Sequence, residues 1–351
     1  MTDPKRVLIV APNWLGDIVM ALPSVAAFRD HFALQHLAVA LPRGMVPVIR
    51  LLSGLDAVVP LEGGQDGFAS DVATLAGRKY DVAILFPNSF RSAWMTYRAG
   101  IVERWGYAAD FRSLLLTRAV TRPPEGGHHS NYYRTLLRKL KISIEGDVGN
   151  LVVTDSQRAR ATRLLARHKV ASGKSIVVMA PGAAHGHAKQ WLPERYAEVA
   201  RRSVTELGQS VVFVGGANDR PAGRAIESFL TKFGHGVSDA GRIVNLIGHT
   251  DLTELIGVLA DCEACVSNDT GAMHLAAALA KPVVAVFGPS DERVTAPLGR
   301  HELLSHPVRC RPCLLRDCPI DHRCMTAIST DDVFSALARC LTSNEIIEAS
   351  S

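Results

Sequence analysis

The chain has 351 residues, of which 47% are hydrophobic and 21% are charged, and its formal net charge is +5. This length predicts two domains, because one domain usually holds roughly 100 to 200 residues, and the composition excludes a disordered chain. The mild positive charge favours anionic partners. Only 6% of the residues are aromatic and no basic stripe is interleaved with them, so we expect no nucleic-acid partner.

The sequence favours a cytoplasmic protein that is at most peripheral at the inner membrane. No segment approaches the roughly 18 to 20 apolar residues that a spanning helix needs. Pro12 and Asp17 interrupt the apolar run at 7–10 too early for a signal peptide. Seven cysteines are an odd number, which fits a reducing compartment better than a disulfide framework.

The first half of the chain alternates short apolar runs with helical patterns, as a parallel sheet covered by helices does. The predicted elements are a strand at 7–10, a helix at 17–31, a strand at 36–41, a helix near 46–53 and a strand at 81–86. A charged helix at 154–168 and a turn at 171–174 then predict a domain boundary.

The alternation begins again after residue 175. The predicted elements are strands at 176–180, 211–214, near 243, 264–267 and 283–287, and helices at 194–207, 222–233, 252–260 and 272–280. We therefore predict domains at 1–170 and 171–330, and a C-terminal helix at 331–351 that could pack back on the first domain.

Two doubly wound, Rossmann-like α/β domains that face a central cleft form the GT-B architecture of nucleotide-sugar transferases. Open α/β sheets bind ligands beyond the carboxyl ends of their strands, so the cleft is the expected site. Sugar 2-epimerases and two-lobed binding proteins share this form, and the fold alone does not decide the function.

Asp17 lies where the first strand passes through a short loop into a helix. A carboxylate at this position serves either as a helix cap or first-turn acid, or as a general base, and both interpretations stay open. The loop lacks the G-x-G-x-x-G spacing of a dinucleotide site, which argues against a dehydrogenase.

Two charged residues follow strands of the second domain. Lys189 stands in the glycine-containing loop 181–191, where it could meet a phosphate or be merely solvated. Asp219 follows the next strand, where an acid either accepts hydrogen bonds from ribose hydroxyls or caps a helix.

The segment 266–274 has the most informative pattern, because a strand stops at small polar residues and a helix starts at once. The amide groups of Thr270 and Gly271 and the helix dipole predict a pyrophosphate site. Asp269 would repel a phosphate, so we expect it to cap the helix or to orient a neighbour or a cation. His274, one turn into the helix, could reach the ligand or simply pack.

Four cysteines form a C-x2-C-x4-C-x5-C arrangement in a basic segment near the C-terminus. Structural zinc, redox-active thiols and simple loop packing all remain open for Cys310, Cys313, Cys318 and Cys324. We assign no metal ligand. The basic residues around the thiols could help to hold a phosphorylated acceptor.

The ordered set of motifs resembles glycosyltransferase family 9, and within it the type II heptosyltransferases, over nearly the whole chain. The motifs are Ala11-Pro-Asn-Trp-Leu-Gly-Asp17, Leu85-Phe-Pro-Asn-Ser-Phe-Arg-Ser92, the loop from Pro181-Gly-Ala to Lys189-Gln-Trp191, Ser267-Asn-Asp-Thr-Gly-Ala-Met-His274 and Phe287-Gly-Pro-Ser290.

The resemblance implies an inverting enzyme that moves L-glycero-D-manno-heptose from ADP-heptose to heptose I of the lipopolysaccharide inner core, without a cofactor. The acceptor would be Kdo-lipid A carrying heptose I, met in transient contact with the cytoplasmic membrane face. The first domain would bind the acceptor and the second the ADP-sugar. Site residues implied by the resemblance are the base Asp17, the donor-binding Lys189, Asp219, Thr250, Asp269, Thr270, Gly271 and His274, and the acceptor-binding Asn88, Ser89 and Arg91.

The sequence departs from the family pattern at His185 and His187, where an acidic or aromatic residue and then a proline are more usual. Two other functions stay open. One is a heptosyltransferase for heptose I or a later heptose, and the other is a nucleotide-sugar-binding protein without catalysis. The presence of Asp17 favours an enzyme.

Overall fold

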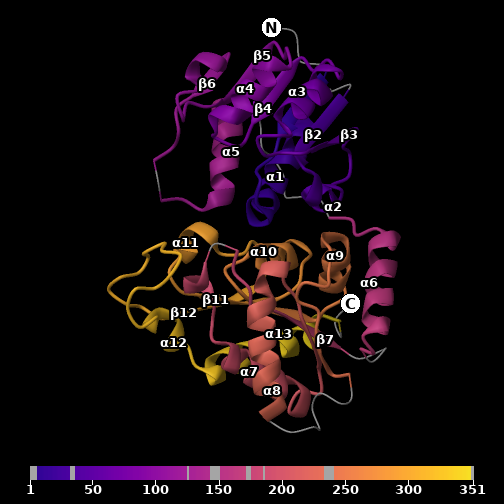
Figure 1. The fold of residues 1–351 in the computed structure, drawn as a ribbon, viewed down its shortest axis with the longest axis vertical. Helices are drawn as coiled ribbons and strands as arrows, with labels where there is room; N and C mark the ends of the chain where they lie inside the picture. Colours follow the sequence, from indigo (N-terminus) through magenta and orange to yellow (C-terminus); the bar gives the residue numbers. More distant parts are fainter. Residues whose placement is uncertain are drawn as a thin grey trace. The chain divides into compact units, whose positions relative to one another are not determined.

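The computed structural model describes residues 6–31, 36–124, 126–142, 151–170, 175–184, 186–232 and 241–348. The chain divides into two compact units, Met1–Val152 and Val153–Ser351, and Figure 1 shows an α/β arrangement in each. The turn expected at 171–174 lies outside the described residues. No helix in the described part of the chain is long and apolar enough to cross a membrane.

The first unit holds a parallel sheet of six strands in the order β3-β2-β1-β4-β5-β6. Its strands are β1 (Arg6–Val10), β2 (His36–Pro42), β3 (Ala57–Leu61), β4 (Val82–Leu85), β5 (Glu103–Tyr107) and β6 (Arg118–Val120). Its helices are α1 (Leu15–His31), α2 (Val46–Ile49), α3 (Phe68–Ala76), α4 (Phe90–Arg98), α5 (His129–Lys139) and the 3-10 turns η1 (Arg43–Met45) and η2 (Ser113–Leu115).

The second unit repeats this arrangement in the order β12-β11-β10-β7-β8-β9. Its strands are β7 (Ile176–Ala180), β8 (Ser210–Phe213), β9 (Ile243–Asn245), β10 (Ala264–Asn268), β11 (Val283–Phe287) and β12 (His301–Ser305). Its helices are α6 (Asp155–Arg167), α7 (Pro193–Thr205), α8 (Arg220–Lys232), α9 (Leu252–Ala260), α10 (Gly271–Ala278), α11 (Glu292–Thr295), α12 (Arg323–Thr326), α13 (Thr330–Glu348) and the turns η3 (His187–Lys189) and η4 (Ala217–Asp219).

The apolar runs of the sequence become the central strands because a parallel sheet is covered by helices on both faces. All residues of β4, β7, β8, β10 and β11 are buried. Each unit has a core of its own around its sheet. The doubly wound α/β prediction is confirmed for both units.

The boundary between the units precedes α6, earlier than the predicted boundary at 170. Helix α6 packs against α9, and Arg158 forms an ion pair with Asp261 at 2.5 Å. Thr154 caps α6 in a capping box with Gln157. The helix expected at 154–168 therefore forms, but as part of the second unit.

The C-terminal helix α13 also packs on the second unit. It contacts α7 and the strands β10, β11 and β12. Val333, Ala336, Leu337 and Cys340 enter the core of that unit. This buried apolar face accounts for the packing of α13 on the second unit. The expected packing of the C-terminal helix back on the first domain stays a prediction.

Candidate functional site

In the first unit, the candidate base lies at the point where the strand order reverses. Strand β1 has β2 on one side and β4 on the other, and open α/β sheets bind ligands beyond the carboxyl ends of strands at such a point. Asp17 lies in the first turn of α1, directly after β1. Asn88 and Ser89 follow β4, so candidate base and candidate acceptor residues share one edge of the sheet.

Helix α5 places an imidazole and aromatic side chains on the side of Asp17 that it packs against. The sequence analysis did not identify these residues. Nε2 of His129 lies 3.7 Å from an Asp17 carboxylate oxygen and 3.1 Å from the Tyr133 hydroxyl. The His129 ring stacks on Tyr132 with an interplanar angle of 11°. Tyr132 accepts a hydrogen bond from the Asn88 amide at 2.7 Å, which links α5 to the loop after β4.

Burial determines the charge of His129. Desolvation lowers the pKa of His129 below the ordinary histidine value of 6.5, and this effect outweighs the opposing influence of the Asp17 carboxylate. The imidazole is therefore mostly neutral at pH 7. Burial also raises the pKa of Tyr133 well above 10. The His129 imidazole that contacts Asp17 is therefore a polar neighbour that carries little positive charge at pH 7.

The three predicted acceptor residues lie together around the start of α4. Ser89 is the N-cap and accepts a hydrogen bond from the Ser92 amide. Arg91 forms a long ion pair of 3.5 Å with the buried Asp71 and packs over the Phe68 ring. Arg91 therefore contacts two residues of its own unit, while its side chain remains 38% exposed.

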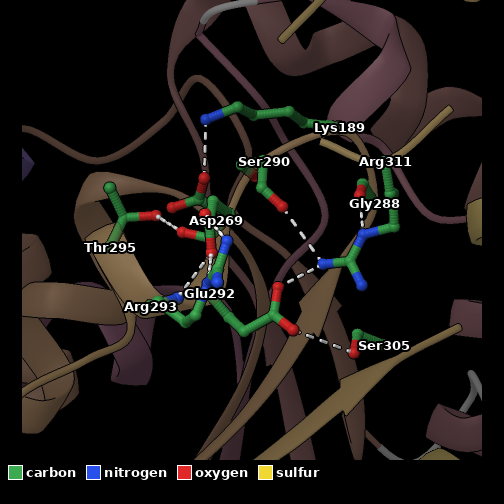
Figure 2. Close-up of polar contacts among 10 residues, drawn as sticks. Lys189, Asp269, Gly288, Ser290, Glu292, Arg293, Thr295, Ser305 and Arg311 are labelled. Atoms are coloured by element: carbon green, nitrogen blue, oxygen red, sulfur yellow. Dashed lines mark hydrogen bonds and ion pairs between the residues drawn. The ribbon is translucent and has the colours of Figure 1, made fainter. Parts of the chain in front are cut away.

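In the second unit, a lysine and an aspartate pair where its strand order reverses, between β7 and β10. Nζ of Lys189 donates to a carboxylate oxygen of Asp269 at 2.6 Å, as Figure 2 shows. Their side chains are 17% and 5% exposed, respectively. Asp269 precedes the N-cap Thr270 and orients a neighbouring cation, one of the roles predicted for it.

Asn268 at the end of β10 joins the two loops that carry this pair. Its amide donates to Pro181 O at 2.7 Å and to Gly182 O at 3.2 Å. Its oxygen accepts from Trp191 N and from the Tyr196 hydroxyl. The side chain is fully buried, and its four bonds fix the path of the loop at 181–191.

Replacing Asn268 with alanine is expected to lower the free energy of unfolding of the second unit by about 3 kcal/mol, because several buried polar groups lose their partners together. Trp191 is the single tryptophan after residue 152, so its fluorescence during urea unfolding reports on this unit once the other tryptophans are replaced by phenylalanine. Asn218→Ala, at an exposed asparagine of the same unit, is the matched control and is expected to change stability by less than about 0.5 kcal/mol. Equal stability of the two variants would contradict the role of Asn268.

Helix α10 begins at Gly271, with Thr270 as its N-cap. The Thr270 side chain makes no cap hydrogen bond and instead contacts the Ser267 hydroxyl at 3.0 Å. Thr270 and Gly271 are half-buried, beside the Lys189–Asp269 pair. His274 is only 5% exposed. Both alternatives for His274, contact with the ligand and packing, stay predictions.

Asp219 links the loops that follow β7 and β8 through hydrogen bonds. Its two carboxylate oxygens accept hydrogen bonds from the Gly216 amide at 2.8 Å and the Ala183 amide at 3.2 Å. A Cβ on Gly182 would lie 2.2 Å from the Asp219 carboxyl carbon, so this approach requires glycine. The capping interpretation fits this geometry, and ribose binding stays a prediction. Thr250 is half-buried in the loop before α9.

Comparison with known proteins decides the family. The sequence profile of glycosyltransferase family 9 (heptosyltransferase) matches residues 72–323. The chain belongs to glycosyltransferase family 9. It is therefore a glycosyltransferase, as predicted, and the strands β4, β7, β8, β10 and β11 with their loops fall within the part that matches family 9.

Its relatives within family 9 are heptosyltransferases. Lipooligosaccharide heptosyltransferase 2 of Haemophilus influenzae is 28% identical over 84% of this chain and 86% of its own. Lipopolysaccharide heptosyltransferase 1 of Pseudomonas aeruginosa is 29% identical over 89% and 87%. The solved ADP-heptose lipopolysaccharide heptosyltransferase II of Escherichia coli superposes with a TM-score of 0.81 at 25% identity, covering 97% of this chain and 99% of its own.

The cysteine-bearing segment of this family 9 protein contacts the loops that follow β7 and β11. Arg311 donates to Gly288 O at 2.6 Å and Ser290 O at 3.1 Å and pairs with Glu292, as Figure 2 shows. Nε2 of His322 lies 2.7 Å from Ala188 O, and the Ala188 amide donates to Arg316 O at 2.8 Å. The segment thus contacts both the amide and the carbonyl group of Ala188, the residue next to Lys189.

The thiols of this segment are close enough to influence one another. Burial, and then the thiols of Cys310, Cys313 and Cys318, raise the pKa of Cys324. Within the described ranges, no three His, Cys, Asp or Glu side chains are placed so that they could hold a metal ion. His187 pairs with Asp317 at 3.1 Å on the surface, where both are largely exposed, and His185 lies outside the described residues.

Proposed function

We propose that the protein transfers L-glycero-D-manno-heptose from ADP-heptose to heptose I of the lipopolysaccharide inner core, with inversion at the anomeric carbon. The Lys189–Asp269 pair, held beside the start of α10 at the reversal point of the second sheet, carries the proposal for the donor. A lysine and helix N-terminal amides are groups that bind a diphosphate. The similarity to heptosyltransferases supports heptose as the sugar that is transferred.

The proposed reaction is a single displacement. Asp17 accepts the proton of an acceptor heptose hydroxyl, and that oxygen forms a bond to the anomeric carbon as the bond to ADP breaks on the opposite face. Lys189 and the amides of Thr270 and Gly271 meet the charge that grows on the departing diphosphate. Asp219, Thr250, Asp269 and His274 complete the proposed donor-binding set. No step needs a cofactor.

The proposed acceptor is Kdo-lipid A carrying heptose I, bound through Asn88, Ser89 and Arg91. The first unit presents these residues and Asp17 at one edge of its sheet. A lipid-linked acceptor would bring the enzyme into transient contact with the cytoplasmic face of the inner membrane. The domain roles follow from this, with the acceptor on the first unit and the ADP-sugar on the second.

A second candidate function is transfer to Kdo-lipid A itself, which the likeness to the type 1 enzyme of Pseudomonas aeruginosa supports. The deciding experiment incubates the full chain with ADP-heptose and either Kdo-lipid A or Kdo-lipid A bearing heptose I, followed by mass spectrometry. We expect the mass of one heptose to be added only to the second acceptor. Addition only to the first would establish the type I activity, and no addition despite ADP-heptose binding would favour a non-catalytic binding protein.

A further inference from the structure

Helix α4 exposes a row of aromatic rings on the surface of the first unit. Phe90, Trp94 and Tyr97 recur at helical spacing and therefore share one face of the helix. The ring centroids lie 6.3 Å apart for Phe90 and Trp94 and 5.5 Å apart for Trp94 and Tyr97, with both pairs stacked. Phe90 and Tyr97 are each 48% exposed. A row of large apolar side chains outside the core points to an interaction surface.

The loop between β5 and β6 adds two side chains that are almost fully exposed. Phe111 is 99% and Leu114 96% exposed. Asp110 and Phe111 have φ values of +46° and +55°, a backbone conformation that is costly for residues other than glycine. Their neighbour Arg112 is fully buried and donates to Tyr107 O at 3.0 Å. The loop is thus anchored while its apolar side chains point into solvent.

The helix and the loop are neighbours. Turn η2, which carries Leu114, contacts α4, and Arg112 also bonds to the Ser92 hydroxyl of α4 at 3.0 Å. In Figure 1, α4 lies beside the edge of the sheet that ends in β5 and β6. We call the five apolar residues of this region the aromatic array, which comprises Phe90, Trp94, Tyr97, Phe111 and Leu114.

The segment that carries the aromatic array has a net positive charge. Residues 90–122 contain six arginines and two acidic residues, a net charge of +4. The Arg98 guanidinium lies over the Trp94 ring at 5.5 Å, and that of Arg104 over the Tyr97 ring at 5.2 Å. Aromatic rings with adjacent cations are typical of protein surfaces that meet the headgroup layer of a membrane.

We propose that the aromatic array docks on an anionic lipid bilayer. Phe111 and Leu114 enter the boundary between headgroups and acyl chains, the rings of α4 lie at headgroup level, and the exposed Arg98 meets lipid phosphates. Charge complementarity selects a bilayer as the occupant over an apolar protein surface. This inference names the surface through which the proposed membrane contact would be made. It rests on the proposed function, which supplies the lipid-linked acceptor.

Vesicle flotation tests the proposal on the full chain, with vesicles of phosphatidylglycerol and phosphatidylcholine or of phosphatidylcholine alone. The unmodified protein is expected to float with the anionic vesicles and to dissociate as salt rises. Phe111→Ser/Leu114→Ser is expected to weaken binding at least tenfold, because two insertable side chains are lost. Ile320→Ser, at a 63% exposed residue of the second unit, is the matched control and should bind as the unmodified protein does.

A charge variant and a sizing measurement complete the test. Arg98→Gln is expected to weaken binding to anionic vesicles about fivefold. Absence of vesicle binding by the unmodified protein, or undiminished binding by Phe111→Ser/Leu114→Ser, would overturn the proposal. A dimer that this double variant converts to a monomer would also overturn it, since the array would then join two copies. Donor and acceptor are absent from the assay, so its failure is distinct from failure of heptose transfer.

Discussion

Replacing Asp17 with asparagine is expected to lower kcat by about 10² to 10⁴, the contribution typical of a general base. Asparagine keeps the shape of the side chain and its polar contact with His129, but it cannot accept the proton of the attacking hydroxyl. The affinity for ADP-heptose is expected to stay unchanged, because the proposed donor residues belong to the second unit. Calorimetric titration with ADP-heptose and a transfer assay measure the two quantities on the same preparation.

The matched control is Asp66→Asn, an identical change at an exposed residue of the same unit, which should leave kcat as it is. Near-normal turnover by Asp17→Asn would remove Asp17 from the mechanism.

The neutral His129 also predicts how the basicity of Asp17 changes with pH. Because burial holds the pKa of His129 below 6.5, its imidazole gains a proton only as the pH falls below that value. The resulting cation then reduces the basicity of Asp17.

Sequence patterns predicted the central strands well because each is buried on both faces. The strands expected at 176–180 and 283–287 have those bounds in the structure. Strands β3, β5, β6 and β12 were not predicted, and all of these except β5 lie at the edge of a sheet, as does β9, which was expected near 243. Strand β6 has three residues, none of them buried, and β12 has no fully buried residue. An edge strand is covered on fewer sides, so its sequence carries a weaker apolar signal.

The helix expected near 46–53 is shorter in the structure, where α2 spans Val46–Ile49. Its apolar pattern continues through Leu51 and Leu52, which are buried outside the helix, and the chain then turns at Gly54 with a φ of +79°. These buried leucines therefore extended the apolar pattern of the sequence beyond the end of the helix. The glycine was the local signal that the helix had ended.

The candidate site was only partly predictable, because its contacts join residues far apart in the chain. Asp17 and the segment 266–274 stand out locally, where a strand passes abruptly into a helix. Their partners do not. His129 is brought to Asp17 by the packing of α5 on α1, and the pairing of Lys189 with Asp269 depends on β7 lying next to β10. The sequence analysis assigned neither this helix packing nor the strand order, so neither contact could be predicted.

Replacing Lys189 with methionine is expected to lower kcat/KM by about 10² to 10³, the loss typical of one electrostatic donor to a developing anion. Methionine keeps the length of the side chain and removes its charge. The change also leaves the Asp269 carboxylate, which is 5% exposed, without its ion-pair partner. A loss of about 1 to 3 kcal/mol in the free energy of unfolding should therefore accompany the loss of activity.

The double variant Lys189→Met/Asp269→Asn separates these two effects. Asparagine carries no charge to leave unpaired, so thermal unfolding of the double variant should return towards that of the unmodified protein, while kcat/KM stays low. Lys189→Arg keeps a cation beside Asp269 and should retain more activity than either. If Lys189→Met/Asp269→Asn regained both stability and transfer, the lysine would serve only to neutralise Asp269. The departing diphosphate would then have to be met by the amides at the start of α10 alone.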